Sequence, residues 1–142
     1  MTKTLQRLVY RSTATGSTTS LLNLVSILGE SQRNNDRDEL TGALAAHGGR
    51  YVQVVEGAAT TLDGLLRRLE RDPRHKDIKL LERENITSRE FGRWAMANAV
   101  VTPEAAPVLE DLMASDFPSA ALIVEALKAA VSLQQAEALQ PS

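Results

Sequence analysis

Two adjacent glycines, Gly48 and Gly49, constrain the fold of this 142-residue chain more than any other feature. They separate two runs of strand-forming residues, LTGALAAH and RYVQVVEG. Glycine adopts positive φ at no steric cost, so a Gly-Gly pair suits the two-residue turn of an antiparallel hairpin. The sequence therefore predicts a β-hairpin over residues 40–56.

The predicted hairpin places a glutamine where an apolar residue is normally found. With this turn, Leu44 lies opposite Gln53, and side chains alternate between the two faces of the strand. Tyr51, Gln53 and Val55 then share one face. A buried amide needs hydrogen-bond partners. Gln53 is therefore either a site residue or a residue at a solvated sheet edge.

Hydrophobic periodicity assigns the remaining elements up to residue 102. Residues 5–12 alternate as a strand does, and residues 18–32 carry apolar residues at helical spacing. The other predicted elements are a helix from Thr60 to the Asp72-Pro73 pair, a strand at 77–86 and a last strand from Trp94 to Val101. The β-α-β-β-α-β-β order is typical of a ferredoxin-like α+β fold with two helices on one face of the sheet.

The helix that starts near Thr60 carries signals at both ends. Thr60 and Asp63 have the spacing of a capping box, and Asp72-Pro73 is a stop signal. Its predicted apolar stripe consists of Leu62, Leu65, Leu66 and Leu69.

The chain changes character after residue 102. Residues 103–142 carry six carboxylates and one lysine, a net charge of −5, which leaves +3 for the rest of a chain whose net charge is −2. Helices are predicted at 103–113 and from Pro118 onward. The second has a wide apolar surface, which must pack on the open sheet face or on another subunit. We expect a domain over residues 1–102, a C-terminal helical extension over 103–142 for output or oligomerisation, and a homo-oligomer.

Composition and motifs exclude or disfavour several chemistries. Cysteine is absent, which removes disulfides and thiolate sites. His47 and His75 lack metal-ligand spacing, and the chain has no Walker loop, GxGxxG or nucleophile elbow. The charge is too balanced for a nucleic-acid surface, and no apolar run reaches the ~18 residues of a membrane span. We expect a cytoplasmic protein with no metal site, no catalytic residue, and no nucleic-acid or membrane partner.

Neutral hydrogen-bonding residues stand where a core is normally apolar. Tyr10 and Gln53 lie in the middle of predicted strands, and Asn34 and Asn35 lie at the end of a predicted helix. Such residues suit a pocket for an uncharged planar ligand with polar edges. Each also has an ordinary interpretation, as a buried tyrosine, an edge glutamine or a helix C-cap. Glu56 is interpreted as a strand-end carboxylate that accepts backbone hydrogen bonds.

At these residues the sequence resembles the BLUF family, the blue-light sensors using FAD. The resemblance covers residues 5–98, and its specificity lies in the order and spacing of six short pieces. The pieces are LVYRS at 8–12, SQRNN at 31–35, LTGAL at 40–44, YVQVVEG at 51–57, RDPRH at 71–75 and FGRWAM at 91–96. The resemblance implies FAD held non-covalently between the sheet and two helices, with FMN or riboflavin as alternatives.

The resemblance gives four of these residues distinct roles. Tyr10 matches the tyrosine that passes an electron and a proton to the excited flavin. Gln53 matches the glutamine between that tyrosine and the flavin ring. Asn35 matches the asparagine that holds the polar edge of the ring, and Asn34 matches a variable neighbour near the flavin.

Three further residues acquire roles in the same way. Trp94 and Met96 match light-responsive residues of the last strand, and which of them lies nearer the flavin differs between family members. Arg68 matches a basic residue near the FAD phosphates, although it can also be an ordinary solvated helix arginine. The implied photoactive residues are thus Tyr10, Gln53, Trp94 and Met96.

The resemblance implies a photoreceptor and not an enzyme. Light is expected to rearrange the hydrogen bonds of Gln53, by rotation or tautomerisation, and to act through the last strand on the C-terminal helices. The chain resembles the short, stand-alone members, which act through oligomer changes and separate signalling partners.

Two alternatives to a photoreceptor stay open. One is a flavin-free interaction module with the same fold. The other is an acyl-phosphate hydrolase, although TATGSTTS forms no convincing phosphate cradle.

Overall fold

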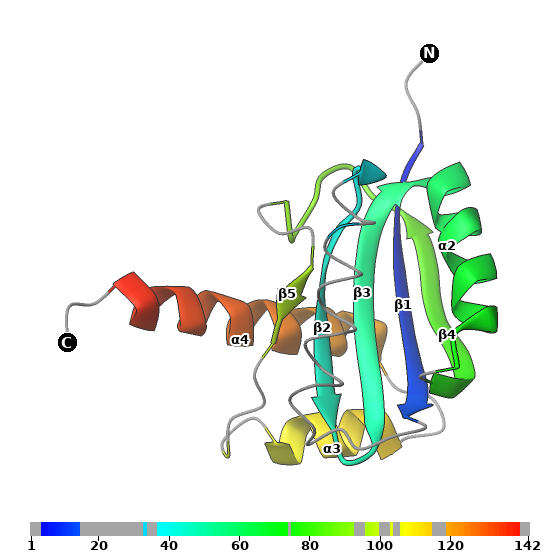
Figure 1. Ribbon diagram of the computed structural model, residues 1–142. Coiled ribbons are helices and arrows are strands. Elements are labelled where there is room, and N and C mark those ends of the chain that lie inside the picture. Colours follow the sequence, from blue (N-terminus) through cyan, green and yellow to red (C-terminus); the bar gives the residue numbers. More distant parts are fainter. Residues whose placement is uncertain are drawn as a thin grey trace.

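The computed structural model describes residues 4–14, 33, 37–73, 75–92, 96–99, 103, 106–114 and 119–139. Its elements are β1 (Leu5–Ala14), β2 (Thr41–His47), β3 (Arg50–Ala58), α2 (Ala59–Arg71), β4 (His75–Asn85), β5 (Ala97–Asn98), α3 (Ala106–Ala114) and α4 (Ala120–Leu139). They form one sheet of order β4-β1-β3-β2-β5 (Figure 1). All neighbouring strands are antiparallel except β2 and β5. The predicted ferredoxin-like α+β fold is confirmed, and the helix predicted at 18–32 lies outside the described residues.

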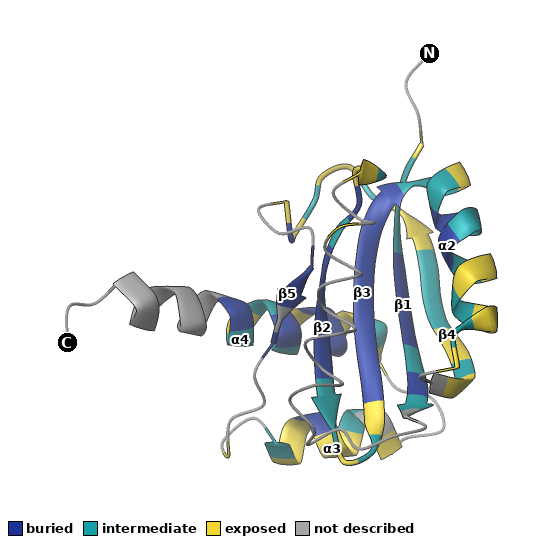
Figure 2. Ribbon diagram, in the orientation of Figure 1, coloured by how far each residue is buried: buried dark blue, intermediate teal, exposed yellow. Residues whose placement is uncertain are grey.

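The central hairpin forms as predicted. Gly48 and Gly49 have φ angles of 59° and 78°, in the left-handed region that glycine tolerates. Leu44 lies opposite Gln53 in the β2–β3 register. Residues 51–57 of β3 are all buried (Figure 2), because β1 and β2 flank this strand and apolar side chains cover both of its faces.

One face of the sheet packs against α2. The hydrophobic cluster on this face, here called the α2-face cluster, also receives Leu66 and Leu69 at its margin, so the predicted stripe of α2 faces the sheet. Its buried members are Leu8, Tyr10, Leu40, Leu44, Tyr51, Val55, Leu62, Leu65 and Met96.

The opposite face of the sheet packs against α4, which passes behind β2 and β3 in Figure 1. This α4-face cluster contains Val9, Ala43, Ala45, Val52, Val54, Phe91, Ala97, Ala99, Leu109, Ile123, Val124, Leu127 and Val131. The described part of the C-terminal apolar surface therefore lies on the open sheet face, one of the two alternatives that the sequence allowed.

Polar contacts add to the docking of the C-terminal helices. His47 Nε2 at the end of β2 lies 2.8 Å from Glu110 Oε1 of α3. Lys128 Nζ of α4 lies 2.6 Å from Glu90 Oε2, in the segment before β5. Such exposed pairs are screened by solvent and contribute little to stability. The apolar cluster is therefore the main source of α4 docking.

Two local predictions were wrong. Ala58, at the end of β3, is the N-cap of α2, and no side chain caps this helix. Because the chain passes directly from strand to helix, Thr60 is already inside α2, and Asp63 instead forms an ion pair of 2.7 Å with Arg83 of β4. The last strand is also shorter than predicted. Of the described residues 96–99 it comprises Ala97–Asn98, which pair in parallel with β2, and the ends of the predicted range lie outside the described residues.

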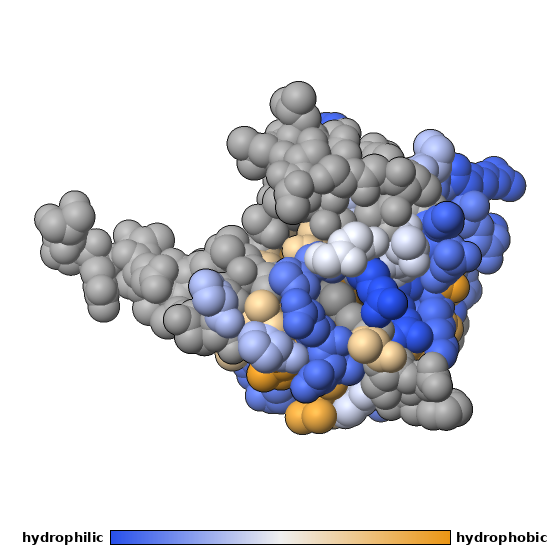
Figure 3. Space-filling model, turned by 90° about the horizontal axis from the view of Figure 1, so that it is seen from below, coloured by the Kyte–Doolittle hydropathy of each residue, from blue (hydrophilic) through white to orange (hydrophobic). Residues whose placement is uncertain are grey.

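The helices that the structure describes include none with the length and apolar character needed to cross a bilayer. Figure 3 views the molecule from the end of the sheet that carries the β2–β3 turn. The described surface there is mostly hydrophilic, and its apolar residues form small separate spots. Interfaces are usually marked by larger continuous apolar patches.

Gly42 stands where β2 runs close to β3. A Cβ built at this position overlaps the backbone carbonyl oxygen of Val54 and lies 3.2 Å from Val55 Cα. Both obstacles belong to the backbone of the central strand and cannot turn aside. We expect Gly42→Ala to lower the free energy of unfolding by about 2–3 kcal/mol, as overpacking does. Urea denaturation measures this change.

Gly64→Ala is the matched control. Gly64 lies inside α2, and the nearest atom to an added Cβ is an Arg67 guanidinium nitrogen at 3.8 Å. Alanine is more stable than glycine inside a helix, so this variant should gain about 0.5–1 kcal/mol. Equal free energies of unfolding for the two variants would contradict the close approach at Gly42.

Candidate functional site

The site begins with a pair of buried polar side chains on adjacent strands. Tyr10 of β1 lies directly opposite Gln53 of β3, and both side chains project from the face covered by α2. The Tyr10 hydroxyl donates a hydrogen bond to Gln53 Oε1. Tyr10 is 1% and Gln53 7% exposed. The expectation of a buried glutamine with partners is therefore met, and the edge-glutamine alternative is not.

Met96 extends this pair toward β5. Gln53 Nε2 donates to Met96 Sδ at 3.4 Å, and Met96 is 2% exposed. The parallel pairing of Ala97 with Ala43 of β2 brings Met96 there, because β2 in turn pairs with β3. A thioether sulfur is a weak acceptor. The Gln53 amide thus has one firm partner and one weak partner among the described residues.

The Tyr10 side chain is a neutral phenol in this environment. Burial raises the pKa of its hydroxyl far above the ordinary value of about 10, and the negative charge of Asp72 raises this pKa further. A neutral phenol keeps its proton and can donate it in a hydrogen bond. The orientation of the Gln53 amide, with its oxygen toward Tyr10, fits this donor.

Arg68 has a different setting. It is exposed on α2, and its Nη1 lies 3.3 Å from Asp38 Oδ2. The same carboxylate accepts from Arg37 Nε at 3.1 Å. The hydrogen bond from Arg37 and the charges of both guanidinium groups hold the pKa of the Asp38 carboxyl below its ordinary value. Arg68 therefore belongs to a surface ion pair, and a role near phosphates stays a prediction.

The structure brings together three of the seven predicted site residues, Tyr10, Gln53 and Met96. Arg68 is held apart from them in its surface ion pair. The remaining three, Asn34, Asn35 and Trp94, lie outside the described residues. Their assigned roles stay predictions.

Glu56 follows Gln53 on β3 and serves another purpose. It is fully buried, and its carboxylate accepts hydrogen bonds from the backbone N–H groups of Glu90 and Phe91. This confirms the interpretation as a strand-end carboxylate. Arg89 joins the same network by donating to the Glu56 carbonyl oxygen at 3.0 Å. No sequence signal pointed to Arg89, because the segment between β4 and β5 has no periodic pattern.

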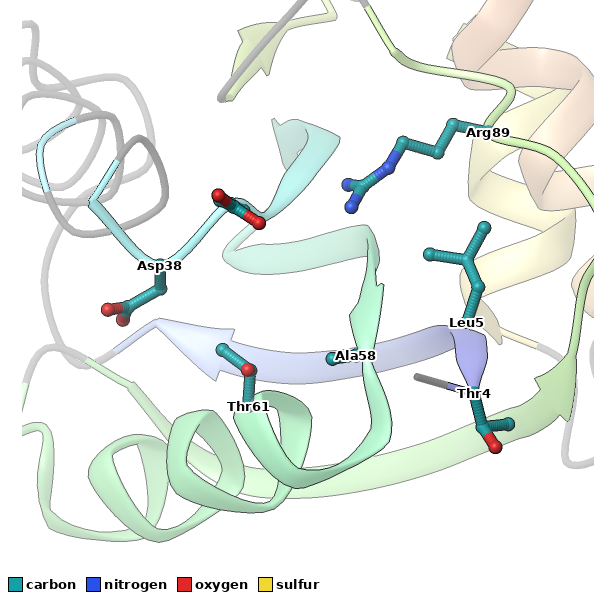
Figure 4. Close-up of a pocket in the computed structure, with 7 residues that line it drawn as sticks. Thr4, Leu5, Asp38, Ala58, Thr61 and Arg89 are labelled. Carbon is teal, nitrogen blue, oxygen red and sulfur yellow. The ribbon is translucent and has the colours of Figure 1, made fainter. Parts of the chain in front are cut away.

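A polar cavity of about 170 Å³ lies at the N-terminal end of α2 (Figure 4). The Arg89 guanidinium points into it, whereas the Asp38 carboxylate points away. Its lining residues are Thr4, Leu5, Asp38, Glu39, Ala58, Thr61 and Arg89. Because neither Tyr10 nor Gln53 lines it, this cavity is separate from the Tyr10–Gln53–Met96 site.

Comparison with known proteins gives these residues a context. The family model "BLUF: Sensors of blue-light using FAD" matches residues 5–97. The photoactivated adenylate cyclase subunit beta of Euglena gracilis is 31% identical over 112 residues, which are 78% of this chain and 13% of that protein. The chain thus spans about an eighth of the length of this curated relative.

Solved structures give the same result. BlrB, a BLUF protein in its dark state, is 31% identical, with a TM-score of 0.80 over 91% of this chain and 98% of that chain. A bacterial light-regulated adenylyl cyclase is 33% identical, with a TM-score of 0.69 over 77% of this chain and 33% of that chain. This likeness to the cyclases is confined to their BLUF part.

The family match runs from the first residue of β1 to the first residue of β5, and within it lies the buried Tyr10–Gln53 pair. The chain therefore belongs to the BLUF family of flavin-binding blue-light sensors.

Proposed function

We propose that this protein is a photoreceptor that holds FAD on the α2 face of its sheet, with the flavin ring beside Gln53. The observation that carries the proposal is the buried chain of hydrogen bonds Tyr10–Gln53–Met96. FMN or riboflavin would fit the same ring site, since the three cofactors share the ring. Asn35 and Asn34 are proposed at its polar edge, and Arg68 toward the phosphates of FAD.

The described residues fit a flavin ring at this position. Gln53 offers two amide hydrogens, and only one has an acceptor, Met96 Sδ, among the described residues. The second can be donated to a carbonyl group of the ring. The apolar side chains of the α2-face cluster, such as Leu40 and Leu65, suit the flat surface of a ring and exclude water from it.

A bound flavin supplies blue-light absorption and, once excited, a strong oxidant. Tyr10 is proposed as the electron donor. Its hydroxyl proton can leave along the existing hydrogen bond to Gln53 Oε1 as the electron leaves the phenol. The raised pKa keeps Tyr10 protonated before light arrives. Loss of one electron and one proton would leave Tyr10 neutral, and the Gln53 amide would accept the proton at Oε1 and release one from Nε2 toward the reduced ring.

Gln53 is proposed as the switch because the two ends of its amide differ. Oε1 faces Tyr10 and Nε2 faces Met96. Rotation of the amide would exchange these ends, and tautomerisation would change which end accepts. Rotation would take the donor away from Met96, and tautomerisation would leave a single hydrogen on Nε2, so both changes alter the present hydrogen bond to Met96. Such a bond contributes about 0.5–1.5 kcal/mol net, enough to shift a nearly balanced equilibrium severalfold.

The proposed output passes from Met96 through β5 to the C-terminal helices and then to a separate signalling partner. The domain boundary at residue 102 and a cytoplasmic location belong to the same proposal. A role as sensor and not catalyst is supported by the match to only the BLUF part of the cyclases. A homo-oligomer also belongs to the proposal. Because the described α4 stripe is buried on the sheet, its contact on the C-terminal helices would involve other residues, such as exposed Val108 and Leu122.

An absorption spectrum in the dark and after blue light tests the proposal. We expect a flavin spectrum that moves slightly to the red in light and returns in the dark. A flavin spectrum that only bleaches would overturn the photocycle. A colourless protein that cannot be reconstituted with FAD would favour the interaction module.

Tyr10→Phe tests the electron donor. The variant keeps the ring of Tyr10 but removes the hydroxyl, so it should bind flavin and show less than about a tenth of the light-induced shift. The other tyrosine, Tyr51, lies on the same face and is also buried. Tyr51→Phe is therefore the control and should keep the photocycle. A normal photocycle in Tyr10→Phe would contradict the proposed role.

Gln53→Leu tests the amide switch. Leucine has a similar size but neither accepts from Tyr10 nor donates to the flavin, so the variant should stay yellow without a red shift. Its unfolding free energy should fall by about 1–3 kcal/mol, because the buried Tyr10 hydroxyl loses its acceptor. Gln6→Leu, on the same sheet, is the control. A full red shift in Gln53→Leu would rule out the amide as the switch.

A further inference from the structure

A second buried polar side chain of β3, Glu56, forms hydrogen bonds with the backbone of residues 90 and 91, which precede Met96 in the sequence. Glu56 is 0% exposed and, by strand alternation, projects from the α4 face of the sheet, opposite to Gln53. Its Oε1 accepts from Thr41 Oγ1 at 3.0 Å and from the backbone N–H of Phe91 at 2.9 Å. Its Oε2 accepts from the backbone N–H of Glu90 at 2.6 Å.

Arg89 closes this arrangement into a network. Its Nη1 donates to Thr41 Oγ1 at 2.9 Å and to the Glu56 carbonyl oxygen at 3.0 Å. Residues 89–91 are therefore tied to the paired ends of β2 and β3, where Thr41 and Glu56 face each other. Hydrogen bonds to a carboxylate are among the stronger ones in proteins, and here they hold a segment that belongs to no helix or strand.

Two side chains five residues apart in the sequence lie on opposite faces of the sheet. Phe91 is buried in the α4-face cluster, and Met96 is buried in the α2-face cluster. Strand β3 forms hydrogen bonds with both of these places in the chain. Glu56 binds residues 90–91, and Gln53 binds Met96. With one end fixed firmly, the short span between them limits where the Met96 sulfur can lie.

We propose that Glu56 is a positioning residue for the light response. By fixing residues 90 and 91 it sets the place of Met96 against the Gln53 amide, and so the stability of the dark arrangement relative to the lit one. This inference rests on the proposed function and adds to it a carboxylate that touches neither the flavin nor Tyr10.

Glu56→Gln is the test. An amide keeps the size of the side chain but puts an N–H donor against one of the two backbone N–H groups. The dark-recovery rate constant should change by about threefold or more. The ¹³C-methyl resonance of Met96 in the dark protein should also move, and only Met1 and Met113 share this label. A purely structural anchor would lower the thermal midpoint and change neither readout.

Glu84→Gln is the matched control, with the same loss of charge at an exposed position on β4. It should leave the recovery rate and the Met96 resonance unchanged. Should Glu56→Gln fail to fold, Thr41→Val removes one partner of the carboxylate and should shift both readouts in the same way, by less.

The outcomes separate the two proposals. A reversible red shift in the unmodified protein, with an unmoved Met96 resonance and recovery rate in Glu56→Gln, overturns the positioning role and leaves the photoreceptor standing. Absence of any red shift in the unmodified protein overturns the photoreceptor and the positioning role with it. A changed rate and a moved resonance in Glu56→Gln, absent in Glu84→Gln, support both.

Discussion

The register of the β2–β3 hairpin is the constraint on which the site depends. A slip of one residue would send every side chain of β3 to the opposite face. Gln53 would then leave Tyr10, and Glu56 would leave the segment it binds. The Gly48-Gly49 turn fixes the register, and the close approach at Gly42 leaves no room for a side chain between the strands. The positions of Gln53 and Glu56 are therefore determined by the backbone geometry of the hairpin, and not by the hydrogen bonds that their side chains form.

Strand β3 carries one buried polar side chain to each face, and each finds partners outside its own hairpin. Buried polar groups without partners are costly, so Gln53 and Glu56 commit the fold to particular neighbours. Gln53 requires Tyr10 of β1, and Glu56 requires the backbone of residues 90–91. The two requirements fix the entry of the chain into β5. In the proposed photoreceptor, a single strand thus specifies both the flavin site and the path of the signal away from it.

The sequence predicted the features that depend on local periodicity and not those that depend on the path of the chain. The Leu44–Gln53 register follows from the Gly48-Gly49 turn, and the shared face of Tyr51, Gln53 and Val55 follows from alternation. The absent cap at Thr60 does not, because it depends on β3 running directly into α2. Arg89 lies in a segment without pattern, and its partners Thr41 and Glu56 are 48 and 33 residues away. The sequence also did not determine whether the apolar surface of α4 packs on the open sheet face or on another subunit.

The strands differ greatly in how firmly they are held. β1 pairs along its length with β3 and β4, whereas β5, within the part of the chain that the structure describes, contributes the two pairs Ala97–Ala43 and Asn98–Leu44. Elements with few hydrogen bonds open at low free-energy cost. In the proposed photocycle, loss of the bond between Gln53 and Met96 would therefore act on the strand with the fewest described pairs, while Glu56 keeps the preceding residues in place. We expect a change confined to β5 and the C-terminal helices, with the backbone pairing of β1 and β3 left intact for the return to the dark arrangement.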